Sequence, residues 1–181
     1  MKNIILFSVI FFSALKLQAQ QKIQRCQDDM TDEVSFITSG LVVANKDKTQ
    51  SFRIELDILE REDKTIMSNG LTLKVVGLGN CFKNDNLIFL FENGQKISIT
   101  SWNDFNCEGD IWFFLNDGGS QWYKDSETYT DILKAQKLVK IRYTNGSSHE
   151  SLTREISGNN QNYFIELFKL IAENKVVPCK E

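Results

Sequence analysis

One stretch of the chain, residues 102–123, concentrates side chains that could bind a ligand or carry out hydrolysis. It holds seven aromatic residues within 22 positions, with acidic residues among them. Exposed tryptophan rings can bind the faces of sugars, and two carboxylates at a suitable separation can hydrolyse a glycosidic bond. The residues expected to form such a binding site are Trp102, Asp104, Phe105, Glu108, Asp110, Trp122 and Tyr123.

The same stretch has a structural interpretation, which we favour. Trp112 and Phe114 would share one face of a strand over residues 111–115, and that face could pack against a C-terminal helix. Aromatic side chains dominate the energetics of protein cores, so such a face needs no ligand. Trp122 and Tyr123 follow a Gly-Gly-Ser tripeptide, and we expect this pair to be exposed.

The sequence contains no complete catalytic, metal or cofactor motif. His149 is the only histidine, and it lies among Asn, Gly and Ser residues that are typical of a solvated hairpin tip. No Gly-x-Ser-x-Gly pattern is present. Residues 104–110 resemble the beginning of a calcium loop, but the twelfth position is Leu115, where such a loop needs a bidentate carboxylate. We therefore expect no catalytic residue, no bound metal and no cofactor.

Four cysteines predict two disulfides. Cys81 and Cys107 bracket two strand-like segments, and Cys26 and Cys179 lie near opposite ends of the chain. Among the three possible connectivities, these positions favour Cys81 with Cys107 and Cys26 with Cys179. A zinc site is the alternative, but no two of the cysteines have the short spacing of a metal knuckle.

The N-terminus has the pattern of a secretory signal. Residues 1–19 contain Lys2, an apolar run over residues 4–15 and the small residue Ala19 at a possible cleavage point. The run is too short to span a bilayer. Cleavage would leave one globular domain of 162 residues, from 20 to 181, which is long enough for an independent core. We expect the mature protein to be secreted or periplasmic.

Charge and hydropathy exclude two classes of partner. The formal net charge is −3, and removal of Lys2 and Lys16 with the signal would make it −5. No cluster of Lys and Arg is present, so nucleic acid is not an expected partner. No second apolar stretch reaches 18 residues, so we expect no integral membrane segment after cleavage.

Alternating and turn-forming residues predict an antiparallel sheet. Apolar and polar residues alternate over 51–61, and Asn93-Gly94 separates strand-like segments at 86–91 and 96–100 as a two-residue hairpin turn would. Asn69-Gly70 and Asn145-Gly146 are further turn signals. The other expected strands are residues 34–43, 71–76, 111–115, 138–143 and 151–156.

In the C-terminal part of the sequence, apolar residues recur at the spacing of a helix. A short helix is expected over residues 130–136, and aromatic and aliphatic residues over 160–174 recur at the period of an amphipathic helix. Pro178, the only proline, would mark its outer limit. These elements predict an α+β fold, mainly an antiparallel β-sheet (a sandwich or partly open barrel) with the C-terminal amphipathic helix packed on one face.

Together these features favour an exported, non-catalytic binding domain for a protein or glycan partner, of the inhibitor or immunity type. One alternative is a carboxylate-dependent saccharide hydrolase that uses residues 102–123. Another is an envelope assembly component that presents an edge strand or an apolar patch to its partner.

Overall fold

The computed structural model describes residues 23–102, 105–115 and 122–179, with the side chains of residues 122–127 left out. The expected signal peptide, residues 1–19, lies outside this part. The strands are β1 Ile23–Gln27, β2 Val34–Thr38, β3 Leu41–Ala44, β4 Ser51–Glu60, β5 Ile66–Val76, β6 Asn86–Phe91, β7 Lys96–Thr100, β8 Asp110–Phe114, β9 Leu138–Thr144, β10 Ser151–Glu155 and β11 Val177–Pro178. The helices are α1 Trp122–Ala135, the 3₁₀-helix η1 Gly158–Asn162 and α2 Tyr163–Ala172.

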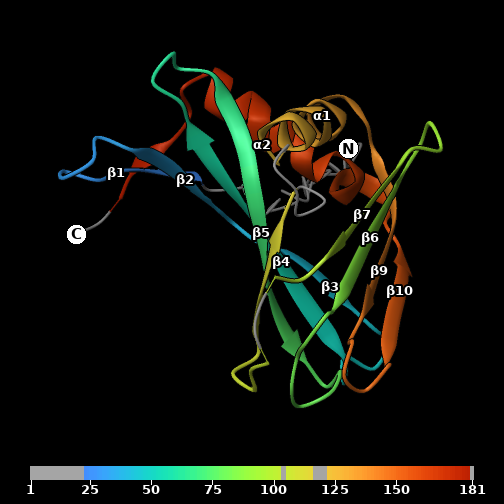
Figure 1. Ribbon diagram of the computed structural model, residues 1–181. Helices are drawn as coiled ribbons and strands as arrows, with labels where there is room; N and C mark the ends of the chain where they lie inside the picture. The colour runs from blue at the N-terminus through green and yellow to red at the C-terminus, as the bar shows by residue number, and fades with distance from the viewer. Residues whose placement is uncertain (1–22, 103–104, 116–121, 180–181) are drawn as a thin grey trace, which may run out of the picture.

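The strands form two sheets. The larger has seven strands in the order β11-β1-β2-β4-β5-β8, with β3 also paired to β4, and the smaller has four in the order β10-β9-β6-β7. Every pairing between these strands is antiparallel except that of β1 with β11. Figure 1 shows the two sheets with α1 and α2 beside them. The predicted α+β class, with mainly antiparallel sheet, is confirmed.

The core lies between the inner faces of the sheets and the two helices. Phe52, Ile54, Leu56 and Ile58 of β4 are buried, as the alternation of that segment predicts. Helix α2 buries its apolar face, and the ring of Phe164 meets that of Phe89 edge-on at 5.6 Å between centroids. The expected packing of the C-terminal helix against a sheet is therefore present. Neither α1 nor α2 is long and apolar enough to cross a membrane.

The segment expected as one strand over residues 34–43 is two strands. β2 pairs with the second half of β4 and β3 pairs with the first half, so the strand is interrupted at residues 39–40. At the break, the Thr38 hydroxyl accepts from the Leu56 N–H at 3.1 Å and donates to the Leu56 carbonyl at 3.2 Å. One side chain thus replaces the missing backbone partners.

The turn predicted at Asn69-Gly70 is wrong. β5 continues through both residues, and its register with β4 shifts between Asp57 and Ile58 as a β-bulge. A Cβ atom on Gly70 would come within 2.8 Å of the Phe113 carbonyl oxygen, so glycine allows β5 and β8 to approach here. Asn93-Gly94 does form a turn, with Gly94 at φ 84° and a Phe91–Gln95 backbone bond that makes the loop three residues, not two.

The ends of several elements differ from the sequence prediction. α1 begins at Trp122, eight residues before the helix expected at 130–136. α2 ends at Ala172, and Pro178 lies in β11, which pairs in parallel with β1. Sequence did not predict β1 or β11, because β1 is polar without alternation and β11 has only two residues.

Both predicted disulfides are present. Cys26 in β1 joins Cys179 just after β11, and Cys81 joins Cys107 beside the isolated bridge between Phe82 and Asn106. The pairing is the one that the sequence favours. The first disulfide secures the C-terminal segment to β1, and the second ties the loop after β5 to the loop before β8.

Candidate functional site

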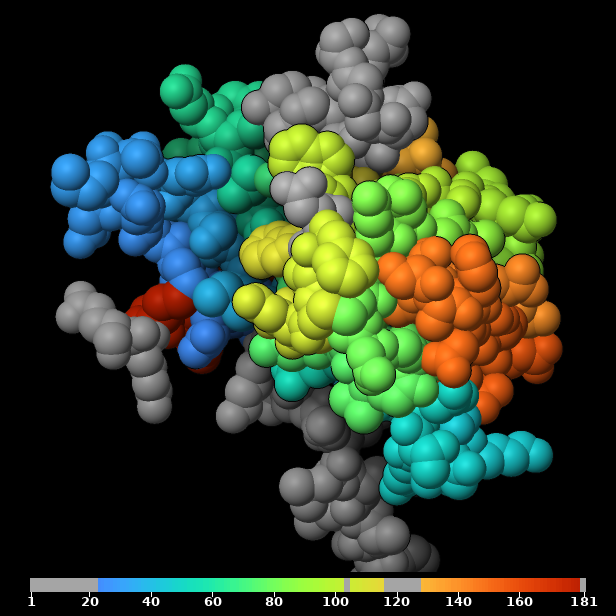
Figure 2. Space-filling model, turned by 60° about the horizontal axis from the view of Figure 1, so that its bottom comes forward, coloured from blue at the N-terminus to red at the C-terminus, as the bar shows by residue number. Residues whose placement is uncertain are grey.

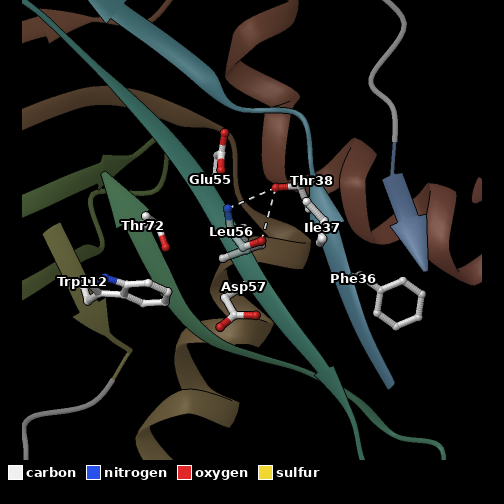
Figure 3. Close-up of a pocket in the computed structure, with 8 residues that line it drawn as sticks. All are labelled: Phe36, Ile37, Thr38, Glu55, Leu56, Asp57, Thr72 and Trp112. Carbon is white, nitrogen blue, oxygen red and sulfur yellow. Dashed lines mark hydrogen bonds between the residues drawn. The ribbon is translucent and has the colours of Figure 1, made fainter. Parts of the chain in front are cut away.

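A groove of about 190 Å³ lies on the outer face of the seven-stranded sheet. Two rows of cross-strand neighbours run over this face. One row joins Glu55, Thr72 and Trp112, and the adjacent row joins Ile37, Asp57, Gly70 and Phe114. Figure 3 shows the groove residues, which also include Phe36, Thr38 and Leu56.

Strand alternation and one glycine explain the hollow. Glu55 and Asp57 alternate with buried Leu56 and Ile58, so both carboxylates lie on the outer face of β4. Gly70 stands between Asp57 and Phe114 in its row and carries no side chain to fill the space. The indole of Trp112 and the side chain of Ile37, each 51% exposed, line the groove on different strands.

The aromatic side of the groove continues beyond Trp112. The backbone N–H of Trp102 donates to the Trp112 carbonyl at 3.1 Å, and the Trp102 ring meets the Phe114 ring edge-on with 5.2 Å between centroids. Trp102 is nevertheless 74% exposed. We call Trp102, Trp112 and Phe114 the aromatic surface. Figure 2 shows the chain around residues 105–114, in yellow, at the surface of the molecule beside the N-terminal strands in blue.

The two carboxylates of the groove differ in their surroundings. Glu55 forms an ion pair with Arg53, whose guanidinium nitrogen lies 2.9 Å from its carboxylate oxygen. Within the described part of the chain, no ion pair involves Asp57. Burial raises the pKa of the half-buried Asp57 carboxyl above its ordinary value, and the negative charge of Glu33 raises it further. Asp57 is therefore a partly desolvated acid with no cationic partner among the described residues.

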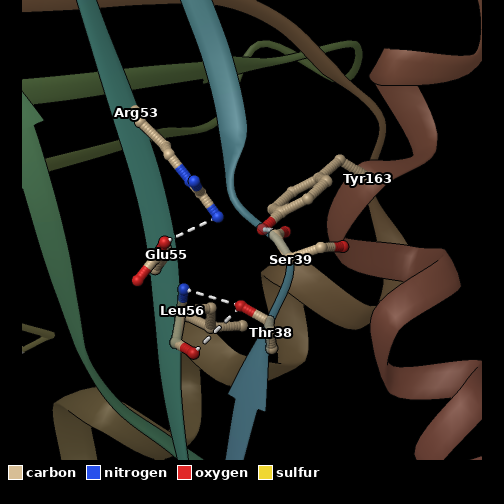
Figure 4. A network of polar contacts seen from close by, with 6 residues as sticks. All are labelled: Thr38, Ser39, Arg53, Glu55, Leu56 and Tyr163. Atoms are coloured by element: carbon tan, nitrogen blue, oxygen red, sulfur yellow. Dashed lines mark hydrogen bonds and ion pairs between the residues drawn. The ribbon is translucent and has the colours of Figure 1, made fainter. Parts of the chain in front are cut away.

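The strands that carry the groove are fixed from the core side. The Tyr163 hydroxyl of α2 donates to the Ser39 carbonyl at 2.6 Å, next to the two hydrogen bonds between the Thr38 hydroxyl and the Leu56 backbone. Figure 4 shows these contacts beside the Arg53–Glu55 ion pair. Burial raises the pKa of Tyr163 to about 12, so this phenol remains a neutral donor at ordinary pH. Helix α2 is thus hydrogen-bonded to the chain just after β2, where Thr38 joins β2 to β4.

The predicted site residues are only partly brought together. Trp102 belongs to the aromatic surface, whereas Phe105, which is 59% exposed, does not line the groove. Glu108 and Asp110 are exposed and lie outside the groove lining, with Asp110 opposite Lys74 at the start of β8. Asp104 lies outside the described residues. Trp122 and Tyr123 begin α1, and their side chains are outside the described part.

The expectation that Trp112 and Phe114 pack against the C-terminal helix is wrong. Ile111, Phe113 and Leu115 face the core instead, while Trp112 and Phe114 face outward. Both sets are apolar, so alternation alone did not identify the inner face. Sequence reasoning also missed Asp57 and its neighbours. The one sequence feature that could have pointed to Asp57 is the row of polar residues that alternates with the buried residues of β4.

The histidine stands apart from the groove. His149 lies in the exposed turn between β9 and β10 with φ 60°, as expected for a hairpin tip. Among the residues that the structure describes, no three His, Cys, Asp or Glu side chains are grouped so that they could hold a metal ion.

Comparison with known proteins identified no relative of this chain. No family model, no curated protein and no solved structure matches the chain.

Proposed function

We propose that this chain is an exported, non-catalytic domain that binds a ligand on the outer face of its seven-stranded sheet. The observation that carries the proposal is the groove beside the aromatic surface. Trp102 and Trp112 are 74% and 51% exposed, although Trp112 lies within β8 and the Trp102 backbone is hydrogen-bonded to it. Contiguous exposed apolar surface, bordered by polar residues, is typical of interaction sites.

Two disulfides support export. Disulfides persist in secreted proteins and in the periplasm, whereas cytosolic thiols are kept reduced. The signal expected over residues 1–19 agrees with this assignment. Secreted or periplasmic localisation is accordingly part of the proposal.

The composition of the groove supports binding without catalysis. Among the described residues, its lining contains two carboxylates and two threonine hydroxyls, with no histidine, cysteine or lysine. One observation favours a saccharide hydrolase as the second candidate, since a raised pKa at Asp57 is typical of a general acid. Glu55, the other groove carboxylate, is engaged by Arg53, so binding accounts for the arrangement more simply.

Affinity capture from the native culture medium or cell envelope tests the proposal. The wild-type protein is compared with Trp112→Ala and with Met30→Ala, which removes an apolar side chain that is 93% exposed in the turn after β1. We expect a partner that the wild type and Met30→Ala retain and that Trp112→Ala loses.

Circular dichroism and urea unfolding establish that each variant is folded. Equal retention by all three proteins contradicts the proposal and favours an assembly role through another surface. Hydrolysis of a peptidoglycan or oligosaccharide substrate that disappears in Asp57→Asn establishes the second candidate and contradicts the non-catalytic assignment.

A further inference from the structure

The groove is smaller than a usual site for a free small molecule. Its volume is about 190 Å³, whereas pockets for drug-sized ligands span roughly 300–1,000 Å³. The space suits one anchoring side chain of a larger partner better than a whole organic ligand. Interfaces between proteins concentrate their binding energy in such anchors, among which Trp, Tyr and Arg are the most frequent.

The charges around the groove favour an anchoring side chain that carries a positive charge. Asp57 is half-buried and has no ion pair within the described chain, and Glu33 adds a second negative charge to its surroundings. A partly desolvated carboxylate without a counter-ion is costly, and a cation placed beside it recovers that cost. A neutral sugar would supply hydroxyl donors but would leave the charge of Asp57 uncompensated.

The Trp112 indole of the aromatic surface favours arginine over lysine as the anchoring side chain. Trp112 and Asp57 lie in adjacent cross-strand rows, on β8 and β4, with β5 between them. A guanidinium can form two parallel hydrogen bonds to a carboxylate and stack its plane on an indole, whereas an ammonium lacks the planar fork. The groove therefore offers arginine both of its preferred contacts, with Thr72 as an additional acceptor on its lining.

From this geometry we infer that the groove receives an arginine side chain of a protein partner, held by the Asp57 carboxylate and the Trp112 indole. The inference rests on the proposed function and specifies its ligand. Ile37 and Trp102, exposed beside the groove, would contact the apolar residues that flank the arginine. Such a partner would complement the acidic character of this chain, whose formal net charge is −3.

Blocked pentapeptides test the chemistry without knowledge of the partner. Acetyl-Gly-Gly-Arg-Gly-Gly-amide is titrated into the protein and compared with the same peptide carrying citrulline, which keeps the shape and removes the charge. The indole N–H signals of the three tryptophans are followed by NMR and assigned with single Trp→Phe variants. We expect millimolar binding of the arginine peptide that shifts the Trp112 signal, because a single anchor contributes only part of an interface.

The matched variants are Asp57→Asn and Asp131→Asn, the latter an exposed aspartate on α1, in the helix layer. Asp57→Asn should lower the affinity for the arginine peptide by roughly tenfold, and Asp131→Asn should leave this affinity unchanged. Equal binding of arginine and citrulline peptides, or no change of the Trp112 signal with either, overturns the inference. A Trp112 shift with neutral oligosaccharides alone also overturns it and indicates a glycan ligand.

The capture experiment separates this inference from the function on which it rests. A partner lost by Trp112→Ala and kept by Asp57→Asn upholds a binding site on this face and contradicts its occupation by arginine. A partner kept by both variants contradicts the proposed function itself.

Discussion

The Tyr143 hydroxyl lies 3.3 Å from the Asp85 carboxylate and donates a hydrogen bond to it, in a region where neither residue is exposed. The Gly146 N–H donates to the same carboxylate oxygen at 2.9 Å, and Ser101 bonds to Asp85 through both backbone and side chain. This network connects the start of β6 with the turn after β9. It is structural, since none of its members lines the groove.

Stability should depend on pH through Asp85. Burial raises the pKa of this carboxyl despite its hydrogen bonds, so the folded protein holds the proton to a higher pH than the unfolded chain does. The contribution of Asp85 to the free energy of unfolding must therefore fall as the pH rises from the ordinary carboxyl pKa through the raised one. Asp85→Asn removes this titration.

Urea unfolding of the wild type and Asp85→Asn over a series of pH values measures the effect. The wild-type value minus the variant value should decrease with rising pH across that window and then level off. A difference that increases with pH would show that the hydrogen bonds, and not burial, determine the protonation of Asp85.

Asp57→Asn should stabilise the fold while it weakens binding. The raised pKa means that the charged carboxylate costs free energy in the unliganded protein at neutral pH, and the amide removes this cost. The partly exposed position limits the gain to about 0.5 kcal/mol. Thermal unfolding at neutral and at acidic pH is the measurement. The gain should vanish at low pH, where Asp57 is protonated, and a loss of stability at neutral pH would contradict the account of its surroundings.

Tyr163→Phe should loosen the support beneath the groove. The variant keeps the ring in the core but removes the donor to the Ser39 carbonyl, at a cost of about 1 kcal/mol. Urea unfolding gives this value, and hydrogen exchange of the amides near residues 38–41 should become faster. Unchanged stability and exchange would show that the hydroxyl does not hold the break between β2 and β3.

The disulfides should contribute unequally to stability. The Cys26–Cys179 pair closes a sequence separation of 153 residues and the Cys81–Cys107 pair one of 26, so the loop-entropy model assigns about 5 and 3.5 kcal/mol to them. Replacing each pair by serine and comparing urea unfolding checks the order. Peptide mapping under non-reducing conditions checks the pairing itself, and any linked peptide that joins Cys26 or Cys179 to Cys81 or Cys107 would refute it.

Much of the fold could be predicted from local patterns. The alternation of β4 identifies both its buried and its wet side chains, and the spacing of Phe164, Leu167, Phe168 and Ile171 identifies the apolar face of α2. The turn at Asn93-Gly94 follows from the positive φ that Gly94 adopts. Asn69-Gly70 carries the same signal inside a strand, because its glycine serves a close approach of two strands and not a turn.

The groove could not be predicted in the same way. It depends on the register that places Ile37, Asp57 and Phe114 in one row, and register between strands far apart in sequence is a tertiary property. Residues 111–115 are apolar on both faces, so their pattern could not show that Trp112 faces outward. Sequence reasoning thus singled out Trp102 but favoured a packed position for Trp112, and it missed the carboxylate of Asp57.

Photo-cross-linking from position 37 tests the central claim most directly. A benzophenone amino acid replaces Ile37, which lines the groove, and a second protein carries it at Met30 as the control. After irradiation with the partner source, the adducts are identified by mass spectrometry. The account predicts an adduct from position 37 whose peptide contains arginine and which Asp57→Asn diminishes. An adduct of equal yield from position 30, or one unaffected by Asp57→Asn, would contradict it.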